Sequence, residues 1–436
     1  MKRPSLTTWS LLALGAGLGL GIVGHKTASP VFESFGEGAK AVGALWIAAL
    51  QLTVLPLVIT QLLAAISSVD AKSVGKLGIK AFVLFVGMLV ASGLFAALLT
   101  PPLVSRLSFD PSTVASLSTA TSSANAVGVA APGSNAPSSS VADWIGDLLP
   151  KSLLEAGMRG DILPLLLFTA LFAIAITRLP QERHQLLTSV FQGLSEGMLQ
   201  VTRWVLVATP VGVFALTYVL ALKTGSATGG MLGAYIVIVS VLILLFTVLL
   251  YPLSTFVGRT KMGDFARAVA PAQMIAASTR SSIASLPALL EGGRKCLHLP
   301  TTGTSFLLPL SVAIFKVNRP MSSVVKLILV AHVYGVPLRP TTIMLFLATV
   351  IIISFGTAGI PQSGPGLKTM PAYFAAGVPI EGVIVLEAVE AIPDIFKTVL
   401  NVTGDMSAAT LLTRSHRAAH SHVSAADSST AAEGTV

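Results

Sequence analysis

The chain is poor in charge and in cysteine, and no histidine accompanies the two serine-rich interruptions of its apolar segments. Only 11% of its 436 residues are Asp, Glu, Lys or Arg, whereas a soluble domain usually has about 25%. The lone cysteine, Cys296, excludes an intramolecular disulfide framework and a cysteine-rich metal centre. Because no base stands beside a serine nucleophile in a recognisable pattern, we do not expect an enzyme.

What the chain has in abundance is apolar sequence: 53% of its residues are hydrophobic, and the mean hydropathy is +0.81. This leaves room for roughly eight to ten segments of about 20 residues, the length that crosses a bilayer. We predict an all-α membrane protein with eight transmembrane helices and two re-entrant helical hairpins. The helices are expected near residues 9–25, 43–67, 79–103, 162–178, 200–222, 230–257, 302–329 and 378–410, and the hairpins near 265–292 and 341–376.

The net charge of +9 is best explained by basic loops, because such residues favour the cytoplasmic side of a membrane. It gives no reason to expect a nucleic-acid partner. The distribution favours a bacterial inner-membrane protein with both termini in the cytoplasm. Two full crossings in place of the hairpins would also give an even count, so charge leaves both topologies open. Composition predicts a flexible outer loop over residues 110–142 and a disordered tail over residues 415–436.

The last apolar segment contains a stripe of polar residues. Relative to Asp394, the residues at +3, +4, +7 and +11 are Lys397, Thr398, Asn401 and Asp405, and on a helix these positions share one face. Ionisable groups at membrane depth are costly and normally face a bundle interior or a watery cavity. The stripe therefore predicts the wall of a solute or ion pathway. On one continuous helix, it would be extended upward by Glu387 and Glu390.

Two other apolar segments are interrupted by small polar residues. The first contains Ser278–Ser282 and the second contains Ser354–Pro365. Such breaks free backbone N–H and C=O groups, which is tolerated at membrane depth only where protein or water satisfies them. A pair of interrupted segments often marks the binding site of a transporter. Ordinary turns outside the membrane are the alternative, and the polar stripe favours the transporter.

Together these features resemble the dicarboxylate/amino acid:cation symporter family, which includes glutamate and aspartate transporters. The resemblance begins at Leu55–Val58, and its most specific part is Lys397–Asp405; Thr279–Ser282 and Gly356–Pro361 match the family's hairpin tips. It implies a homotrimer in which a scaffold holds a transport domain that moves like an elevator. The scaffold would be mainly residues 1–78 and 145–225, and the transport domain mainly residues 79–109 and 226–414.

The resemblance also implies roles for single residues. Asp394 would bind a substrate amino group, and Thr398 and Asn401 would contact the amino and carboxylate groups. Asp405 and the Asn401 carbonyl would help to form one cation site, for which sodium is a candidate. The main carboxylate of the substrate would be held at the hairpin tips, and a nearby arginine would reach toward the acidic stripe. The tip residues are Ser281, Ser282, Ile360 and Gly364, and the arginine is Arg280.

The seventh span departs from the family pattern. The family has an Asn-Met-Asp-Gly-Thr break there, whose carbonyls and carboxylate coordinate sodium. This chain has Phe315, Lys316 and Val317 at the first three of these positions, and Leu84–Leu89 replaces a Tyr-Thr-Ser cluster of the third span. Hard cations need oxygen ligands. We therefore predict that at least one sodium site is absent.

Lys316 has two interpretations that the sequence leaves open. Its ammonium takes the place of a bound cation, or its aliphatic chain carries the ammonium to water. In the first case its partners would be Asp405 or the carbonyls at the break between Ser354 and Thr357.

Lys397 stands where members with acidic substrates have arginine. Arginine holds a carboxylate with a planar fork, whereas lysine is a flexible point charge. Lys397 therefore either binds an acidic side chain of the substrate or pairs internally with Glu390 or Asp394. Pro393 predicts a kink just before the stripe.

The coupling ion and the exact activity stay open at this stage. Protons are the preferred substitute for sodium, because carboxyl groups buried beside apolar surface bind protons more readily. The candidate carriers are Glu387, Glu390, Asp394 and Asp405. No cofactor beyond a coupling Na⁺ or H⁺ is expected. The alternatives are a sodium-independent exchanger of another organic acid or neutral amino acid, a channel, and a non-transporting receptor.

Overall fold

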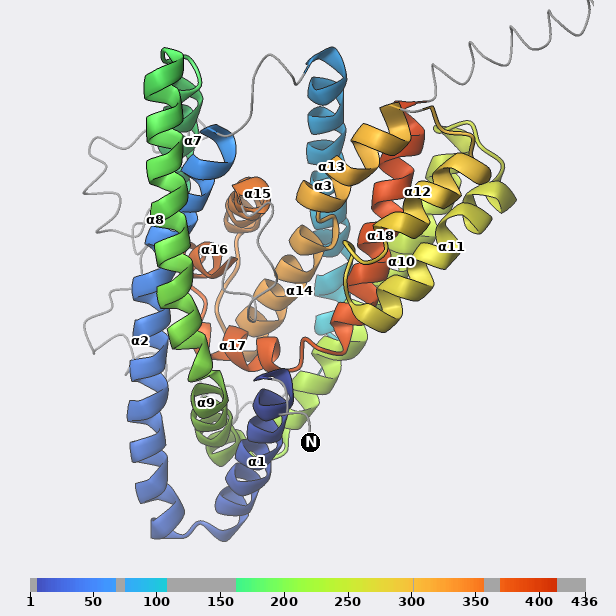
Figure 1. The fold of residues 1–436 in the computed structure, drawn as a ribbon. Helices are drawn as coiled ribbons and strands as arrows, with labels where there is room; N and C mark the ends of the chain where they lie inside the picture. Colours follow the sequence, from blue (N-terminus) through green and yellow to red (C-terminus); the bar gives the residue numbers. More distant parts are fainter. Residues whose placement is uncertain (1–5, 68–74, 108–161, 301, 357–368, 414–436) are drawn as a thin grey trace, which may run out of the picture. The chain divides into compact units, whose positions relative to one another are not determined.

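The computed structural model describes residues 6–67, 75–107, 162–300, 302–356 and 369–413. Within these ranges the regular structure is helical and contains no strand, as predicted for an all-α membrane protein (Figure 1). The helices are α1 (Leu6–Thr27), α2 (Pro30–Ser67), α3 (Gly75–Val104), α7 (Ile162–Ile176), α8 (Gln181–Val207), α9 (Thr209–Thr224), α10 (Ala227–Phe256), α11 (Met262–Thr279), α12 (Leu286–Lys295), the π-helical η1 (Thr302–Leu307), α13 (Leu308–Ile314), α14 (Asn318–Val333), α15 (Pro340–Gly356), α16 (Met370–Ala375), α17 (Ile380–Ala388) and α18 (Pro393–Leu412).

The chain forms two compact units, and α3 and α10 each run from one unit into the other. Unit 1 comprises Met1–Ala71, Gly93–Val239 and Arg319–Pro393, and unit 2 comprises Lys72–Ser92, Ser240–Asn318 and Asp394–Val436. The predicted division into a scaffold and a transport domain concerns movement rather than packing, and it stays a prediction.

Three helical segments in the described ranges are long and apolar enough to cross a membrane: Thr8–Thr27, Leu77–Val104 and Ala227–Phe256. The pair α8 and α9 adds a fourth if it is counted as one span with a bend of 52°. Pro210 stands at the start of α9, where its missing N–H favours a new helix start over continuation of α8. The segment expected as one span at 200–222 therefore belongs to two helices, with the break at Ala208.

In unit 1, α1 packs along α9, and α2 packs along α7, α8 and α9. Small residues permit the closest of these approaches. A Cβ atom added to Gly21 of α1 would lie 2.6 Å from the Cβ of Ala221 and 2.7 Å from the carbonyl oxygen of Tyr218 on α9. Close approach of two backbones through small residues is a common basis of helix packing in membranes.

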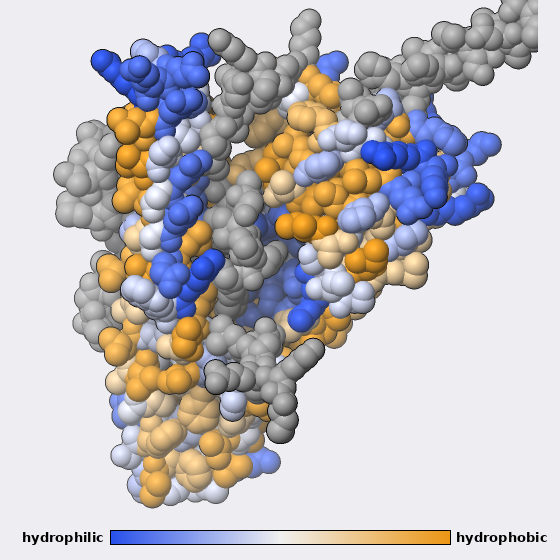
Figure 2. Space-filling view, in the orientation of Figure 1, coloured by the Kyte–Doolittle hydropathy of each residue, from blue (hydrophilic) through white to orange (hydrophobic). Residues whose placement is uncertain are grey.

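In unit 2, α11 and α12 form a helical hairpin at the place where the interrupted segment 265–292 predicts one. The second arm has 10 residues, which makes it about 15 Å long, about half the thickness of the hydrocarbon core. The arms touch closely, since a Cβ atom on Gly292 would lie 2.0 Å from the carbonyl oxygen of Ala268. Figure 2 shows hydrophilic surface where α11 begins and α12 ends. The charged residues at these two helix ends are Asp264, Arg267, Glu291, Arg294 and Lys295.

Two segments that were each expected as one span contain more than one helix, with interruptions where the family pattern and Pro393 indicated them. The segment 302–329 is interrupted between Ile314 and Asn318, where Phe315 has an extended backbone with φ −92° and ψ 106°. The segment 378–410 is interrupted between Ala388 and Pro393, so the predicted kink is a complete break. Proline disfavours helix in the residue that precedes it, which explains why α18 begins at Pro393. Of the second predicted hairpin, near residues 341–376, the structure describes α15 and α16, and residues 357–368 lie outside the described ranges.

The contact between α1 and α9 gives a stability test. We expect Gly21→Ala to destabilise the protein by about 1–3 kcal/mol, as overpacking of a tight interface does, because its Cβ would meet the α9 backbone. Gly19→Ala is the matched control, since a Cβ at Gly19 meets nothing within 4 Å. The measurement is thermal unfolding of both variants in the same detergent. Equal unfolding midpoints would contradict the proposed tight contact.

Candidate functional site

The polar stripe of the last helix lies inside unit 2. Lys397, Thr398 and Asn401 are 3–5% exposed, and Asp405 is completely buried. Asp394, in the first turn of α18, is half-buried. The burial of four of these five side chains confirms that the stripe faces protein and not lipid, as expected for ionisable groups at membrane depth.

Asn318 joins the stripe to the end of the break in the seventh span. Its backbone N–H donates to Oδ1 of Asn401 over 3.2 Å, and its Nδ2 donates to the carbonyl oxygen of Lys397 over 3.3 Å. The Asn401 side chain thereby accepts a hydrogen bond from one of the backbone N–H groups that a helix start leaves without an intrahelical partner. The sequence analysis did not identify Asn318. Its position directly after the break at Phe315–Val317 could have indicated it as a hydrogen-bonding residue.

A chain of hydrogen bonds holds α18 against its neighbours in unit 2. The Tyr251 hydroxyl of α10 donates to Oε1 of Gln273 on α11 over 3.2 Å, and Nε2 of Gln273 donates to the Thr403 hydroxyl over 2.8 Å. One turn farther along α18, the Ser254 hydroxyl donates to the Ser407 hydroxyl over 2.8 Å. Such bonds between membrane helices contribute roughly 0.6–2 kcal/mol each. They fix the rotation of α18 relative to the first hairpin.

The tip of the first hairpin presents polar backbone and hydroxyl groups. Arg280 ends α11 in the left-handed conformation with φ 54°, and it is exposed. The Ser281 hydroxyl accepts the N–H of Ala284 over 3.2 Å, and Ser282 is buried. A left-handed residue at a helix end reverses the chain direction. This turn places both serines at the end of the hairpin, as predicted.

The break in the seventh span is kept but filled with apolar side chains. Phe315 is fully buried and stacks on Phe85 of α3, with ring centroids 4.6 Å apart and planes 11° apart. Val317 is also fully buried and packs with Phe315 against Gly404 of α18. Met88 and Leu89 are buried as well. None of these side chains has an oxygen for a hard cation, so they do not fit the sodium site that the family pattern implies here.

The charge of Lys316 acts on Asp405, the most buried carboxyl group of the stripe. Its Nζ donates to the carbonyl oxygen of Val312 over 2.6 Å. Ser311 also lies beside Asp405, although neither carboxylate oxygen meets full hydrogen-bond geometry among the described residues. The structure thus places an ammonium near the carboxylate that was expected to bind a cation.

The other predicted coupling residues belong to unit 1 or lie outside the described ranges. Ser354 is buried within α15, rather than in the hairpin tip, and its carbonyl oxygen accepts Nη1 of Arg319 over 3.3 Å. Thr357, Ile360 and Gly364 lie outside the described residues. Arg319 was missed, although a charged residue in an apolar span deserves consideration as a functional group.

Glu387 and Glu390 do not extend the stripe of α18, because the helix is broken at residues 389–392. In unit 1, both carboxylates pair with Lys326 of α14, Glu390 over 2.8 Å and Glu387 in a shorter contact. The sequence prediction named both glutamates but missed Lys326. Lys326 could have been found from the sequence, because it is an ionisable residue inside the predicted span 302–329.

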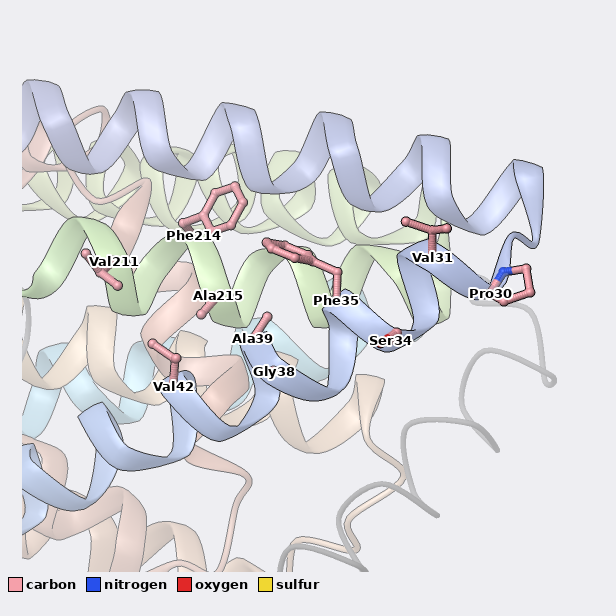
Figure 3. Close-up of a pocket in the computed structure, with 10 residues that line it drawn as sticks. All are labelled: Pro30, Val31, Ser34, Phe35, Gly38, Ala39, Val42, Val211, Phe214 and Ala215. Carbon is pink, nitrogen blue, oxygen red and sulfur yellow. The ribbon is translucent and has the colours of Figure 1, made fainter.

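A pocket of about 780 Å³ lies elsewhere in unit 1, between α2 and α9 (Figure 3). Phe35, Val42, Val211 and Phe214 are among its mostly apolar lining residues, and none of the described residues that line it is charged. These residues offer no ion partner to a charged solute. We therefore place the candidate site along α18 and not in this pocket.

Comparisons with known proteins cover nearly the whole chain. A model of the sodium:dicarboxylate symporter family matches residues 6–415. The proton/glutamate-aspartate symporter of Escherichia coli (strain K12) is 26% identical over 374 residues, covering 85% of this chain and 84% of that protein. The proton/sodium-glutamate symport protein of Bacillus subtilis (strain 168) is 26% identical over 420 residues, covering 95% and 94%. The human neutral amino acid transporter B(0) is 26% identical over 441 residues, covering 93% and 79%. With nearly its whole length matched, the chain belongs to the sodium:dicarboxylate symporter family.

Proposed function

We propose that this membrane transporter moves an acidic amino acid or a C4-dicarboxylate across a bacterial inner membrane, with protons rather than sodium as the coupling ion. The single observation that carries the proposal is the burial of Lys397, Thr398, Asn401 and Asp405 along α18. A buried amine, hydroxyl and amide on one helix face provide the few convergent polar groups that hold a small anion. The similarity to glutamate and aspartate symporters supports the substrate class.

In this proposal the substrate lies against the first half of α18. Asp394 binds its amino group, and Lys397 binds the carboxylate of its side chain. Thr398 contributes its hydroxyl group, which in this structure donates to the carbonyl oxygen of Asp394 over 2.8 Å. The main carboxylate is held by Ser281 and Ser282 at the first hairpin tip. The second tip contributes Ile360 and Gly364, and Arg280 strengthens the positive field for an anionic substrate.

Sodium coupling is disfavoured by the contents of the broken seventh span. Phe315 and Val317 occupy this part of unit 2 without oxygen ligands, and Lys316 supplies a fixed charge to Asp405. A fixed ammonium offsets the charge of a buried carboxylate without consuming a sodium ion. The driving force must then come from another ion, and protons bind to carboxyl groups in apolar surroundings.

The movement follows the family resemblance. A homotrimeric scaffold holds transport domains that carry the substrate across the membrane, with both termini of each chain in the cytoplasm. The short second arm of the α11–α12 hairpin supports a re-entrant position, since about 15 Å of helix does not cross the hydrocarbon core.

A second candidate is sodium-independent exchange of a neutral amino acid or another small organic acid. One observation favours it: Lys397 replaces the arginine expected for acidic substrates. A lysine paired with a carboxylate inside the protein would leave no charge for the substrate. One relative of this chain is named as a neutral amino acid transporter.

The coupling ion is tested with purified protein in liposomes. We expect labelled aspartate or succinate to accumulate under an inside-alkaline pH gradient without sodium, because a buried carboxylate carries the proton inward with the substrate. A sodium gradient at equal pH should give no accumulation. Uptake that requires the sodium gradient and ignores the pH gradient would contradict proton coupling. Counterflow of unlabelled substrate, with empty liposomes as the control, separates a carrier from a channel.

The charge pair in unit 2 is tested by substitution. We expect Lys316→Met to destabilise the protein, because it removes the cation whose charge acts on the buried Asp405 carboxyl group. Lys316→Met/Asp405→Asn removes both charges and should recover most of that loss. Thermal unfolding in sodium-free detergent measures both variants. If the double variant is as unstable as Lys316→Met alone, the interaction between Lys316 and Asp405 is contradicted.

The role of Lys397 is tested by binding. We expect Lys397→Gln to weaken binding of an acidic substrate roughly 10- to 150-fold, the loss of a charged hydrogen bond of about 1.5–3 kcal/mol. Lys397→Arg keeps the charge and is the matched control, with affinity equal or higher. Titration calorimetry on the purified variants gives the dissociation constants. If Lys397→Gln binds acidic substrates as wild type does, the second candidate function is favoured.

A further inference from the structure

The carbonyl end of α15 is in contact with a positive charge that the proposed function does not use. Nη1 of Arg319 donates to the carbonyl oxygen of Ser354 over 3.3 Å, and both residues belong to unit 1. We propose that Arg319 is a built-in cation for the carbonyl end of α15 and takes the place of a coupling ion there. This inference rests on the proposed transport function and extends its account of coupling to a second position.

The last turn of α15 has a partial negative charge. The carbonyl groups of the last four residues of a helix have no N–H partner within it, and α15 ends at Gly356, so the carbonyl of Ser354 is one of these groups. The peptide dipoles add the equivalent of about half a negative charge at this end. The sequence of α15 contains no basic residue that could offset this charge.

The surroundings of this carbonyl group are buried. Val350, Ile353 and Ser354 of α15 are at most 1% exposed. The Ser354 hydroxyl donates to the Val350 carbonyl oxygen over 2.7 Å, so it lies along its own helix. Because burying a polar group without a hydrogen bond is costly, the end of α15 favours a donor or a cation from another element.

Arg319 stands where its own helix disfavours a positive charge. It lies in the first turn of α14, and the N-terminal end of a helix dipole is itself positive. Its side chain is partly buried. The dipole of α14 therefore does not account for an arginine at this position. The carbonyl end of α15 supplies the opposite partial charge, which offsets the unfavourable one.

A guanidinium group suits such a helix end. It has five N–H donors in a fixed plane, stays charged in proteins and is more weakly hydrated than an ammonium. A hard metal ion, in contrast, needs several oxygen ligands arranged around it. An arginine can therefore satisfy carbonyl groups at the end of a buried helix without a bound ion.

The contact also changes the assignment of the cation that was expected at these carbonyls. The sequence analysis offered the Lys316 ammonium as a partner of the break that begins at Ser354. In the structure, the Arg319 guanidinium donates to the Ser354 carbonyl, and the charge of Lys316 acts on Asp405 in unit 2. The two cations thus serve two different groups.

The consequence for transport is one exchangeable ion fewer. A coupling ion must bind and dissociate in each transport cycle, whereas Arg319 stays attached to the chain. With its guanidinium at the Ser354 carbonyl, the end of α15 does not need a sodium ion for its partial charge. The driving ion of the proposed symport must then act elsewhere in the protein.

Conservative substitutions separate the charge of Arg319 from its hydrogen bond. Arg319→Lys keeps the charge without the planar fork, and Arg319→Gln keeps an N–H donor without the charge. If Arg319 acts as a cation, Arg319→Gln should lower the thermal unfolding midpoint by roughly 2–4 °C more than Arg319→Lys does. The measurement uses the full-length protein in sodium-free detergent.

Arg339→Gln is the matched control. Arg339 is exposed and directly precedes α15 at its opposite end, where the helix dipole is positive. This variant should unfold at the wild-type temperature or slightly above it. An Arg319→Gln midpoint equal to or above that of Arg319→Lys would overturn the inference, because a hydrogen bond without a role for charge gives that result.

A second readout returns the missing cation from solution. Arg319→Ala removes the guanidinium group, and low concentrations of guanidinium chloride should raise its unfolding midpoint relative to equal concentrations of choline chloride. Wild type should show no such rise, because Arg319 already occupies the position. Guanidinium that does not stabilise Arg319→Ala, or that stabilises wild type equally, would overturn the inference.

These measurements use no substrate, so they separate the inference from the proposed function. Wild-type protein that transports no acidic substrate would overturn the proposed function, whatever the stability of the Arg319 variants. Arg319 variants that respond neither to charge nor to added guanidinium would overturn only the role of Arg319 at α15.

Discussion

The cost of holding a charge away from water is the constraint on which the rest of this structure depends. In apolar surroundings an isolated carboxylate or ammonium is strongly disfavoured, so each needs a partner of opposite charge or a proton. Among the described residues, lysines act on buried carboxyl groups in both units: Lys316 acts on Asp405 in unit 2, and Lys326 bridges Glu387 and Glu390 in unit 1.

The broken seventh span shows how a site can keep its backbone while its ligands change. The interruption between α13 and α14 is present. Asn318, at its end, donates hydrogen bonds to the Asn401 side chain and to the Lys397 carbonyl oxygen of α18. The side chains at the break are those of an apolar core, with Phe315 stacked on Phe85 and Val317 against Gly404. Membership of a sodium:dicarboxylate symporter family therefore does not by itself establish sodium coupling in this chain. The chemistry of the residues at the break argues for a different ion.

Much of the architecture could be predicted from the sequence, because apolar segments and their interruptions are local features. The helical class, the hairpin of α11 and α12, and the buried stripe of α18 all follow from periodicity and polarity. The breaks at Phe315–Val317 and at residues 389–392 lie within segments that were each expected as one span. Pro393 was a local signal for the second break, whereas the first was indicated only by the family resemblance.

Pairing between distant residues was beyond sequence reasoning. Glu387 and Glu390 were assigned to the α18 stripe because the break was not foreseen. Their partner Lys326 lies 61 positions before Glu387 in the sequence, and its role depends on tertiary packing.

The central claim is that an internal ammonium, rather than sodium, balances Asp405, the most buried carboxylate of α18. Calorimetric titration of sodium into purified wild-type protein, in choline-based buffer with saturating substrate, tests it most directly. The account predicts no saturable heat of sodium binding beyond that of a matched potassium titration. Saturable binding of sodium, abolished by Asp405→Asn, would contradict the account.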